Sequence, residues 1–250
     1  MLIQPLLDKL TQLRMPAFRA ALEEQLGNPQ YAGLSFEDRL GLLVDQECTH
    51  RDSNRLQRRL KAAGLQLPAT IEDLDLSPSR GIDRRLVLQL AQGKWIGQHL
   101  NILILGATGV GKTFLACALA HAACRQDFTV RYQRTSRLLH QTALSHADGS
   151  YSKLLDVLAR VQLLVLDDWL RDPLTRLQSQ DLLEILDDRY GRSSTMVVTQ
   201  VPVEEWHARF PDPTIGDAIL DRLVHNAHRL NLKGESRRKA PAILNISNVV

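Results

Sequence analysis

The beginning of the chain has the spacing of apolar residues that is typical of amphipathic helices. Apolar residues recur every three or four positions before Pro16 interrupts the pattern. Ser35 then has the character of a helix N-cap, with acidic residues in the first turn of a helix that we expect to reach about Lys61. The pattern predicts a small N-terminal helical domain for assembly or partner docking, residues 1–66, and a larger domain, residues 67–250.

Short apolar runs separated by helical segments dominate the chain after residue 100. The first run is followed by a glycine-rich loop and an alanine-rich helix. Nearly continuous apolar strands joined by helices indicate a parallel sheet that is covered on both faces. The expected fold class is therefore α/β, with a five-stranded parallel sheet flanked by helices. The expected strands are residues 101–105, 128–133, 162–166, 195–199 and, with a weaker pattern, 228–233.

The composition is that of an ordinary globular protein, with 44% hydrophobic and 24% charged residues. No apolar run approaches the roughly 20 residues of a membrane-spanning helix, and the N-terminus lacks the pattern of a secretory signal. The three cysteines, Cys48, Cys117 and Cys124, form no CxxC pair. Free thiols in a reducing compartment are therefore favoured, and we expect a cytoplasmic protein without a membrane partner.

A phosphate-binding loop is the strongest chemical signal in the sequence. Residues 106–113 match G-x-x-x-x-G-K-[ST] and stand between an expected strand and an expected helix. Such glycines let backbone N–H groups surround a polyphosphate, and the helix N-terminus adds positive charge. We expect Lys112 to reach the β- and γ-phosphates of ATP and Thr113 to coordinate Mg²⁺. The expected ATP-binding residues are Gly106, Ala107, Thr108, Gly109, Val110, Gly111, Lys112, Thr113 and Phe114.

Two acidic residues follow the third expected strand, in the arrangement known as Walker B. A strand parallel to the first would bring Asp167 to the Mg²⁺ shell. Asp168 either orients and deprotonates the attacking water or caps the next element, and the first interpretation is favoured. At the end of the fourth expected strand, Thr199 or Gln200 either helps to place this water, or the two residues simply mark the transition from strand to loop.

Several further blocks of sequence resemble the IstB family, the transposition helper ATPases of bacterial insertion sequences. The blocks are Asp187-Asp188-Arg189-Tyr190, PVEEWH at residues 202–207, DAILDRLVHNAHR at residues 217–229 and LKGES at residues 232–236. The family belongs to the DnaA/DnaC branch of AAA+ proteins. The resemblance implies a P-loop AAA+ core, ATP and Mg²⁺ as cofactors, and an ATP-dependent homo-oligomer. It also implies assembly on duplex DNA, deformation of that DNA, and recruitment and activation of an IstA-type transposase.

The resemblance also implies an arginine supplied by a neighbouring subunit. Arg222 matches the position of the arginine that contacts the γ-phosphate across a subunit interface in this branch. Two departures from the family pattern affect the placing of water: a serine common before Gln200 is missing, and Leu170 stands where glycine is common. We expect the C-terminal lid to be absent or minimal, with Arg237 and Arg238 either replacing a lid arginine or forming a basic tail.

Basic residues gather in three clusters, as is typical of proteins that contact the phosphate backbone of nucleic acids. The clusters lie within residues 51–61, 125–137 and 229–239. For any one of them, DNA contact and a simple solvated surface are equal alternatives. The resemblance favours the second cluster, and our DNA-binding candidates are Arg134, Arg137 and Lys153. No base-reading pattern accompanies them, so we expect little sequence preference.

Three functions are to be weighed against these features of the sequence. The leading hypothesis is a transposition helper ATPase. A DnaC-like helicase loader shares every nucleotide-binding residue but needs an N-terminal domain that docks a replicative helicase. A small-molecule kinase needs a substrate pocket and a lid, and it leaves the arginine block around residue 222 unexplained.

Overall fold

The computed structural model describes residues 3–234, and the chain divides into two compact units, Met1–Arg58 and one that begins at Arg59. Helix α3 (Phe36–Ala63) is continuous across this division. The domain limits expected from the sequence, at residue 66, stay a prediction. The lid arginines considered above, Arg237 and Arg238, lie outside the described residues.

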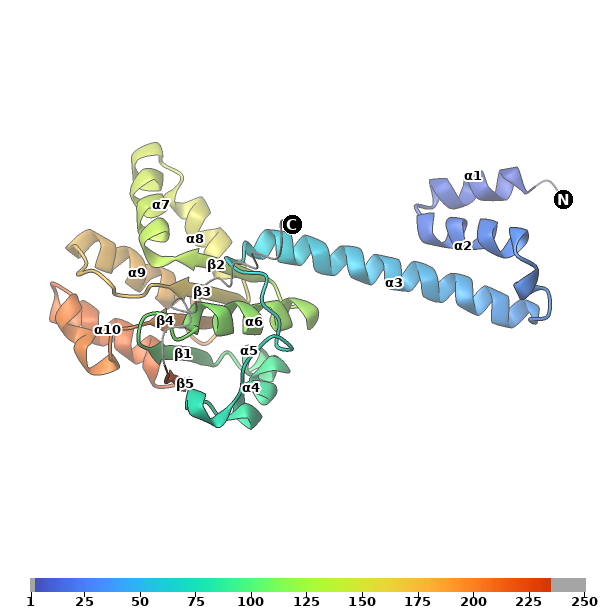
Figure 1. The fold of residues 1–250 in the computed structure, drawn as a ribbon. Coiled ribbons are helices and arrows are strands. Elements are labelled where there is room, and N and C mark those ends of the chain that lie inside the picture. Colours follow the sequence, from blue (N-terminus) through green and yellow to red (C-terminus); the bar gives the residue numbers. More distant parts are fainter. Residues whose placement is uncertain (1–2, 235–250) are drawn as a thin grey trace, which may run out of the picture. The chain divides into compact units, whose positions relative to one another are not determined.

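The first unit is helical, as the spacing of its apolar residues predicts. It contains α1 (Gln4–Gln12), α2 (Pro16–Gly27), a 3₁₀ turn η1 (Pro29–Tyr31) and the first part of α3 (Figure 1). Pro16 does more than end the first helix, because it occupies the first position of α2, where a missing N–H leaves no bond unmade. Ser35 is confirmed as an N-cap: its Oγ accepts a hydrogen bond from the Asp38 N–H at 3.1 Å.

The second unit is built around a sheet of five parallel strands in the order β2-β3-β4-β1-β5 (Figure 1). All five expected strands are present, with their ends shifted by one or two residues. The strands are β1 (Asn101–Gly106), β2 (Val130–Arg134), β3 (Leu163–Asp167), β4 (Ser194–Thr199) and β5 (Ala227–Leu232). Strands β3 and β4 are buried along their whole length, which explains why their sequences are apolar without alternation.

Helices cover the sheet on both faces. The helices of this unit that follow α3 are α4 (Arg84–Ala91), α5 (Lys94–Gly97), α6 (Lys112–Arg125), α7 (Thr135–Asp148), α8 (Tyr151–Arg160), α9 (Arg176–Arg189) and α10 (Pro213–Val224), with 3₁₀ turns η2 (Pro78–Arg80), η3 (Val203–Glu205) and η4 (His207–Arg209). The core on the side of α7 to α10 includes Leu103, Leu164, Leu166 and Val197 from the strands. Side chains alternate along a strand, so their neighbours turn to the other face, where the alanine-rich α6 packs. No helix within residues 3–234 is long and apolar enough to cross a membrane.

The parallel arrangement gives the sheet two different edges. The carboxyl ends of β1, β3 and β4 lie side by side, so the loops that follow these strands meet at one edge. In open parallel sheets, ligands bind at this carboxyl edge. The helices α9 and α10 instead end near the opposite edge, where β4 and β5 begin.

Candidate functional site

The loop between β1 and α6 has the backbone conformation that its glycines permit. Gly106 has φ +149°, and a Cβ there would lie 2.5 Å from the Leu232 carbonyl oxygen on β5. Gly111 has φ +98° and is the residue before α6. A side chain at either position would be strained. The two glycines therefore allow the loop to curve closely over the N-terminus of α6, where backbone N–H groups favour an anion.

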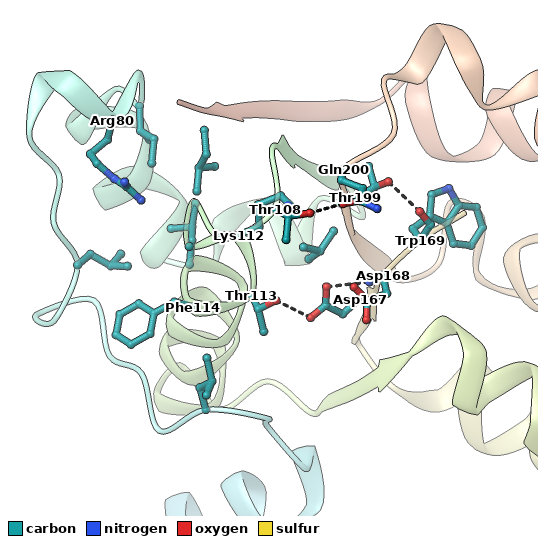
Figure 2. A pocket seen from close by; sticks show the side chains of 18 of the residues that line it. Arg80, Thr108, Lys112, Thr113, Phe114, Asp167, Asp168, Trp169, Thr199 and Gln200 are labelled. Carbon is teal, nitrogen blue, oxygen red and sulfur yellow. Dashed lines mark hydrogen bonds between the residues drawn. The ribbon is translucent and has the colours of Figure 1, made fainter. Parts of the chain in front are cut away.

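Two side chains at the start of α6 point into this loop and toward β3. The Lys112 ammonium lies over the loop and donates to the Ala107 carbonyl oxygen at 2.8 Å. The Thr113 hydroxyl donates to Asp167 Oδ2 at 2.8 Å, across the gap between α6 and the end of β3 (Figure 2). The structure thus brings together the phosphate-binding loop and the first Walker B carboxylate, as the sequence predicts.

Asp167 is fixed from several sides and is only 3% exposed. Tyr132 on β2 donates its hydroxyl hydrogen to Asp167 Oδ2, and the Asp168 N–H donates to Oδ1 at 2.8 Å. Burial, together with the neighbouring Asp167 carboxylate, raises the pKa of Tyr132. The phenol therefore stays protonated and remains a hydrogen-bond donor to the carboxylate.

Asp168 differs from Asp167 because its side chain is 43% exposed and lines the same cavity as the loop. Its backbone has φ +56°, and that of Leu170 has φ +52°. This left-handed conformation explains why glycine suits the position of Leu170, since other residues adopt it at a cost of about 1 kcal/mol or more. The Leu170 side chain is 1% exposed and belongs to the core, so burial offsets part of that strain.

Two polar residues at the end of β4, Thr199 and Gln200, have different roles in the structure. The Thr199 hydroxyl is buried; it donates to the Trp169 carbonyl oxygen at 2.7 Å and accepts from the Val201 N–H at 3.0 Å. Thr199 therefore ties the end of β4 to the loop that carries Asp168. Gln200 is exposed, and its Oε1 accepts a hydrogen bond from the Thr108 hydroxyl across the mouth of the loop. Of the two, Gln200 has the exposed side chain in the lining of the cavity.

A cavity of about 690 Å³ contains these groups. Its polar lining includes residues of the loop, Lys112, the acidic pair and Gln200, and its lining also includes apolar residues that the sequence did not indicate. These are Leu67, Leu74, Leu76, Ile82 and Leu232. A cavity lined by both polar and apolar residues suits a nucleotide, which has charged phosphates and a flat base.

Arg80 is a further residue of the cavity that the sequence did not indicate. Its segment has the composition of a linker, yet it forms the turn η2 and lies against the loop. The Arg80 guanidinium donates to the Val110 carbonyl oxygen and is within 3.1 Å of where a Gly111 Cβ would stand. Its side chain is 9% exposed, and among the described residues its Nε has no hydrogen-bond partner. Arg80 and Phe114 lie on the side of Lys112 away from Asp168 (Figure 2).

The structure separates the three DNA-binding candidates. Arg134 lines the nucleotide cavity, and its Nε donates to Gln66 Oε1 at 3.3 Å. Arg137 on α7 and Lys153 on α8 are exposed to solvent. Lys153 also lines a groove of about 400 Å³ that it shares with Arg131. Only the second and third candidates are thus available to a large partner without entering the cavity.

Arg222 does not line the nucleotide cavity of its own chain. It lies on α10 near the amino edge of the sheet, where its carbonyl oxygen accepts a hydrogen bond from Asn101, the first residue of β1, at 2.9 Å. Because the loop before α6 follows the last residue of β1, the whole length of that strand separates Arg222 from the phosphate-binding loop.

The oxygen atoms beside the loop are suitable for Mg²⁺ bound together with a nucleotide. Mg²⁺ prefers oxygen ligands and is usually held by one or two carboxylates, substrate phosphates and waters. Thr113 and Asp167 supply a hydroxyl and a carboxylate 2.8 Å apart. Residues 3–234 contain no cluster of three or more His, Cys, Asp or Glu that could hold a metal by itself. The donor set therefore fits a cation that arrives with a polyphosphate.

Fold and site together define the class of protein. The strand order, the phosphate-binding loop between β1 and α6, and the acidic pair at the end of β3 are those of a P-loop AAA+ ATPase. A family model described as "IstB-like ATP binding protein" matches residues 8–243. The chain belongs to this family, and the resemblance inferred from its sequence blocks is confirmed.

Individual relatives agree with this assignment. The "Putative insertion sequence ATP-binding protein y4pL" of Sinorhizobium fredii (strain NBRC 101917 / NGR234) is 48% identical over 239 residues, which are 96% of this chain and 98% of the relative. A structure of the replication initiator DnaA bound to AMPPCP and single-stranded DNA has a TM-score of 0.58 at 16% identity, covering 69% of this chain and 52% of that one. The DnaC helicase loader has a TM-score of 0.52 at 20% identity, covering 70% and 99%. The solved structures share the fold, and the family indicates an ATPase role in transposition.

Proposed function

We propose that this ATPase is a helper of DNA transposition that assembles as a homo-oligomer on duplex DNA, remodels the DNA, and recruits or activates an IstA-type transposase. The observation that best supports this proposal is the cavity that contains the phosphate-binding loop and the acidic pair. It occurs in a chain whose family and relatives are named for ATP binding in insertion sequences. The helicase-loader alternative is supported by the similarity in fold to the DnaC helicase loader, at 20% identity, and not by the family.

Within the cavity, each residue of the site has a distinct part in ATP hydrolysis. Lys112 neutralises charge on the β- and γ-phosphates, and Thr113 and Asp167 would hold Mg²⁺, which when bound neutralises phosphate oxygens. Asp168 takes the proton of the attacking water, because both carboxylates line the cavity but Asp168 is the one with an exposed side chain. Gln200 orients this water, and Thr199 fixes the loop that presents Asp168.

Arg222 acts on the nucleotide of a neighbouring copy of the chain. Its place near the amino edge of the sheet, outside its own cavity, supports this role, since a second subunit must bring its carboxyl edge to Arg222. An arginine supplied in this way neutralises charge that develops on the γ-phosphoryl group. Hydrolysis then depends on assembly.

Duplex DNA binds to the exposed basic side chains of α7 and α8, with weak sequence preference. Arg137 and Lys153 belong to helices that pack against each other, and both are exposed. Oligomerisation repeats this pair in every subunit, so a modest charge becomes an extended basic track. Each phosphate neutralised contributes about −0.9 to the log–log slope of affinity against salt on B-form DNA.

A duplex-binding titration over a salt series tests this proposal. With ATP present, we expect binding that weakens steeply with salt and differs little between unrelated sequences. The variant Arg137→Ala/Lys153→Ala should lower affinity equally on all sequences and make the slope shallower, while ATP binding is unchanged. Lys112→Ala should lose ATP binding and, with it, the ATP-dependent part of DNA binding.

Two control variants test whether the change in DNA binding is specific to Arg137 and Lys153. Arg85→Ala removes an exposed arginine from α4 and should leave the slope unchanged. Arg134→Ala should lower nucleotide affinity first, because Arg134 lines the cavity. Equal DNA affinity with and without ATP, or a clear preference for single strands, would refute the helper function and promote the helicase-loader alternative.

A further inference from the structure

The block Asp187-Asp188-Arg189-Tyr190 has no part in the nucleotide cavity, yet the structure gives its members definite partners. Arg189 ends α9 and is 1% exposed. Its guanidinium donates to the Val161 carbonyl oxygen at 2.7 Å, to the Leu158 and Ser194 carbonyl oxygens, and to Thr195 Oγ1 at 3.2 Å. These bonds join the end of α9 to the end of α8 and the start of β4. The backbone on either side of Arg189 is therefore held firmly in place.

Asp187 and Tyr190, on either side of this anchor, both contact Arg222 on α10. Asp187 Oδ1 accepts a hydrogen bond from Arg222 Nε. The Arg222 guanidinium carbon lies 6.0 Å from the centre of the Tyr190 ring, and Nη1 donates to the Ala218 carbonyl oxygen at 2.9 Å. Ion pairing and the ring face thus act on one guanidinium together.

This arrangement leaves one edge of the guanidinium for a partner. Among residues 3–234, no hydrogen bond uses Arg222 Nη2, and the side chain remains 27% exposed. A guanidinium is a rigid fork, so fixing Nε and Nη1 also fixes the direction of Nη2. Arginine side chains lose rotamer freedom when they bind, and a side chain that is already ordered loses less.

We propose that Asp187 is the positioning residue of Arg222: it holds Nε, with Tyr190 beneath the guanidinium, so that Nη2 is directed outward to a phosphate bound by a neighbouring copy. The inference rests on the role in trans given to Arg222 under Proposed function. It explains why an acidic residue on α9 accompanies an arginine on α10 although neither lines the cavity of its own chain. Preorganised donors assist a transition state because they need no reorganisation during the reaction.

Steady-state ATP hydrolysis by the full chain gives the first test. Asp187→Ala should lower kcat by roughly 10-fold or more with little change in the KM for ATP, since small misplacements of a catalytic group have effects of this size. Asp187→Asn, which keeps an oxygen acceptor for Nε, should retain more activity. Asp188→Ala is the matched control: Asp188 is the exposed neighbour on the same helix, and the described structure shows no ion pair for it.

Mixing of variants tells a positioning role from a merely structural one. The Lys112→Ala chain lacks nucleotide but keeps a correctly held Arg222. Mixing it with Asp187→Ala should therefore restore activity at interfaces where its Arg222 meets the nucleotide of an Asp187→Ala chain. Mixing Asp187→Ala with Arg222→Ala should restore nothing, because both chains are defective on the same side. A misfolded Asp187→Ala chain would fail in both mixtures, whereas Asp187→Asn still reports the effect in a folded chain.

The outcomes separate this inference from the proposed function. If Arg222→Ala alone hydrolyses ATP at the wild-type rate, the role of Arg222 in trans is wrong. If Arg222→Ala is inactive but Asp187→Ala and Asp187→Asn turn over as fast as wild type or faster, only the positioning role of Asp187 is overturned. Failure of both Asp187 variants to complement Lys112→Ala would overturn it as well.

Discussion

Asp167 and Asp168 are adjacent in sequence but have different surroundings. Asp167 is buried and bonded to Thr113 and Tyr132, whereas Asp168 faces the cavity with nearly half of its side chain exposed. The backbone turns sharply between the two carboxylates, because Asp168 has φ +56°. One carboxylate is thus suited to a fixed ligand position and the other to contact with water.

Asp168→Asn should therefore leave ATP binding intact and lower hydrolysis by roughly 10²-fold or more, because the amide keeps the shape of the side chain and cannot accept a proton. Labelled-nucleotide titration and phosphate release measure the two effects separately. Asp172→Asn changes an exposed carboxylate four residues along the same loop and should turn over normally. Unchanged hydrolysis in the Asp168 variant would reduce this residue to a structural role.

The sequence predicted those residues whose chemistry lies in a contiguous motif. The loop glycines, Lys112 and Thr113 follow one another, so their geometry is contained in a single pattern. Arg80 could not be predicted, because it meets Val110 through a contact between segments that are 30 residues apart in the chain. For the same reason, the sequence could not predict that the Thr199 hydroxyl bonds to the Trp169 carbonyl oxygen, which lies 30 residues away in the chain.

A buried acidic residue joins two helices of the first unit. Glu47 on α3 is 4% exposed, and its Oε2 accepts hydrogen bonds from the Ala17 and Phe18 N–H groups at 3.0 and 3.1 Å. These donors belong to the first turn of α2 and have no partner within their own helix. Although burial raises the pKa of Glu47, the bonds from Phe18, Arg51 and Ala17 prevail and lower it below its ordinary value.

Glu47→Gln should lower the free energy of unfolding of the first unit by about 2 kcal/mol, since the hydrogen bonds from Ala17, Phe18 and Arg51 would no longer be made to a charged acceptor. A carboxyl whose folded pKa is lowered stabilises above its unfolded pKa, and this contribution disappears as pH falls through the folded value. Below pH 4.5, the ordinary pKa of a glutamate carboxyl, the stability of the variant should therefore fall less steeply with pH than the stability of wild type. Thermal melts followed by circular dichroism over an acid series measure both effects.

Asp45→Asn provides the comparison for this melt series. Asp45 is exposed on the same helix, and its replacement should change neither stability nor acid sensitivity. Equal melting of the Glu47 variant and wild type at neutral pH would show that water satisfies the first turn of α2 equally well.

Most of the helices and strands could be predicted from the sequence. The central strands form unbroken apolar runs, because both of their faces are buried, and such runs are distinctive. β5 alternates between exposed and buried positions near its end and, among the described strands, pairs with β1 alone, so its pattern was weaker. The segment before α4 gave no clear pattern, because its apolar residues line a cavity and have no regular period.

At the scale of the molecule, the proposed role of Arg222 in trans would make hydrolysis a property of the assembly. We expect the ATPase rate per subunit, at saturating ATP, to rise with protein concentration as neighbours supply their arginines. ATP affinity should stay nearly constant, because the cavity is formed within one chain. Light scattering recorded beside phosphate release tests whether the two rise together.

Arg222→Ala should keep a low rate at every concentration in the same experiment. A constant rate per subunit in wild type, across a range in which scattering shows association, would mean that each chain hydrolyses ATP by itself.

The parallel direction of all five strands also bears on how many subunits an assembly contains. It places the phosphate-binding loop at the carboxyl edge and Arg222 near the amino edge. If Arg222 acts in trans as proposed, copies would join head to tail through these two unlike faces. Under the proposed arrangement, an open row has one nucleotide at its terminus that no arginine reaches, whereas a closed ring has none. In short rows this unreached nucleotide is a large share of the total. The fraction of bound ATP that survives a single round of turnover would therefore distinguish a ring from a row and, for a row, indicate its length.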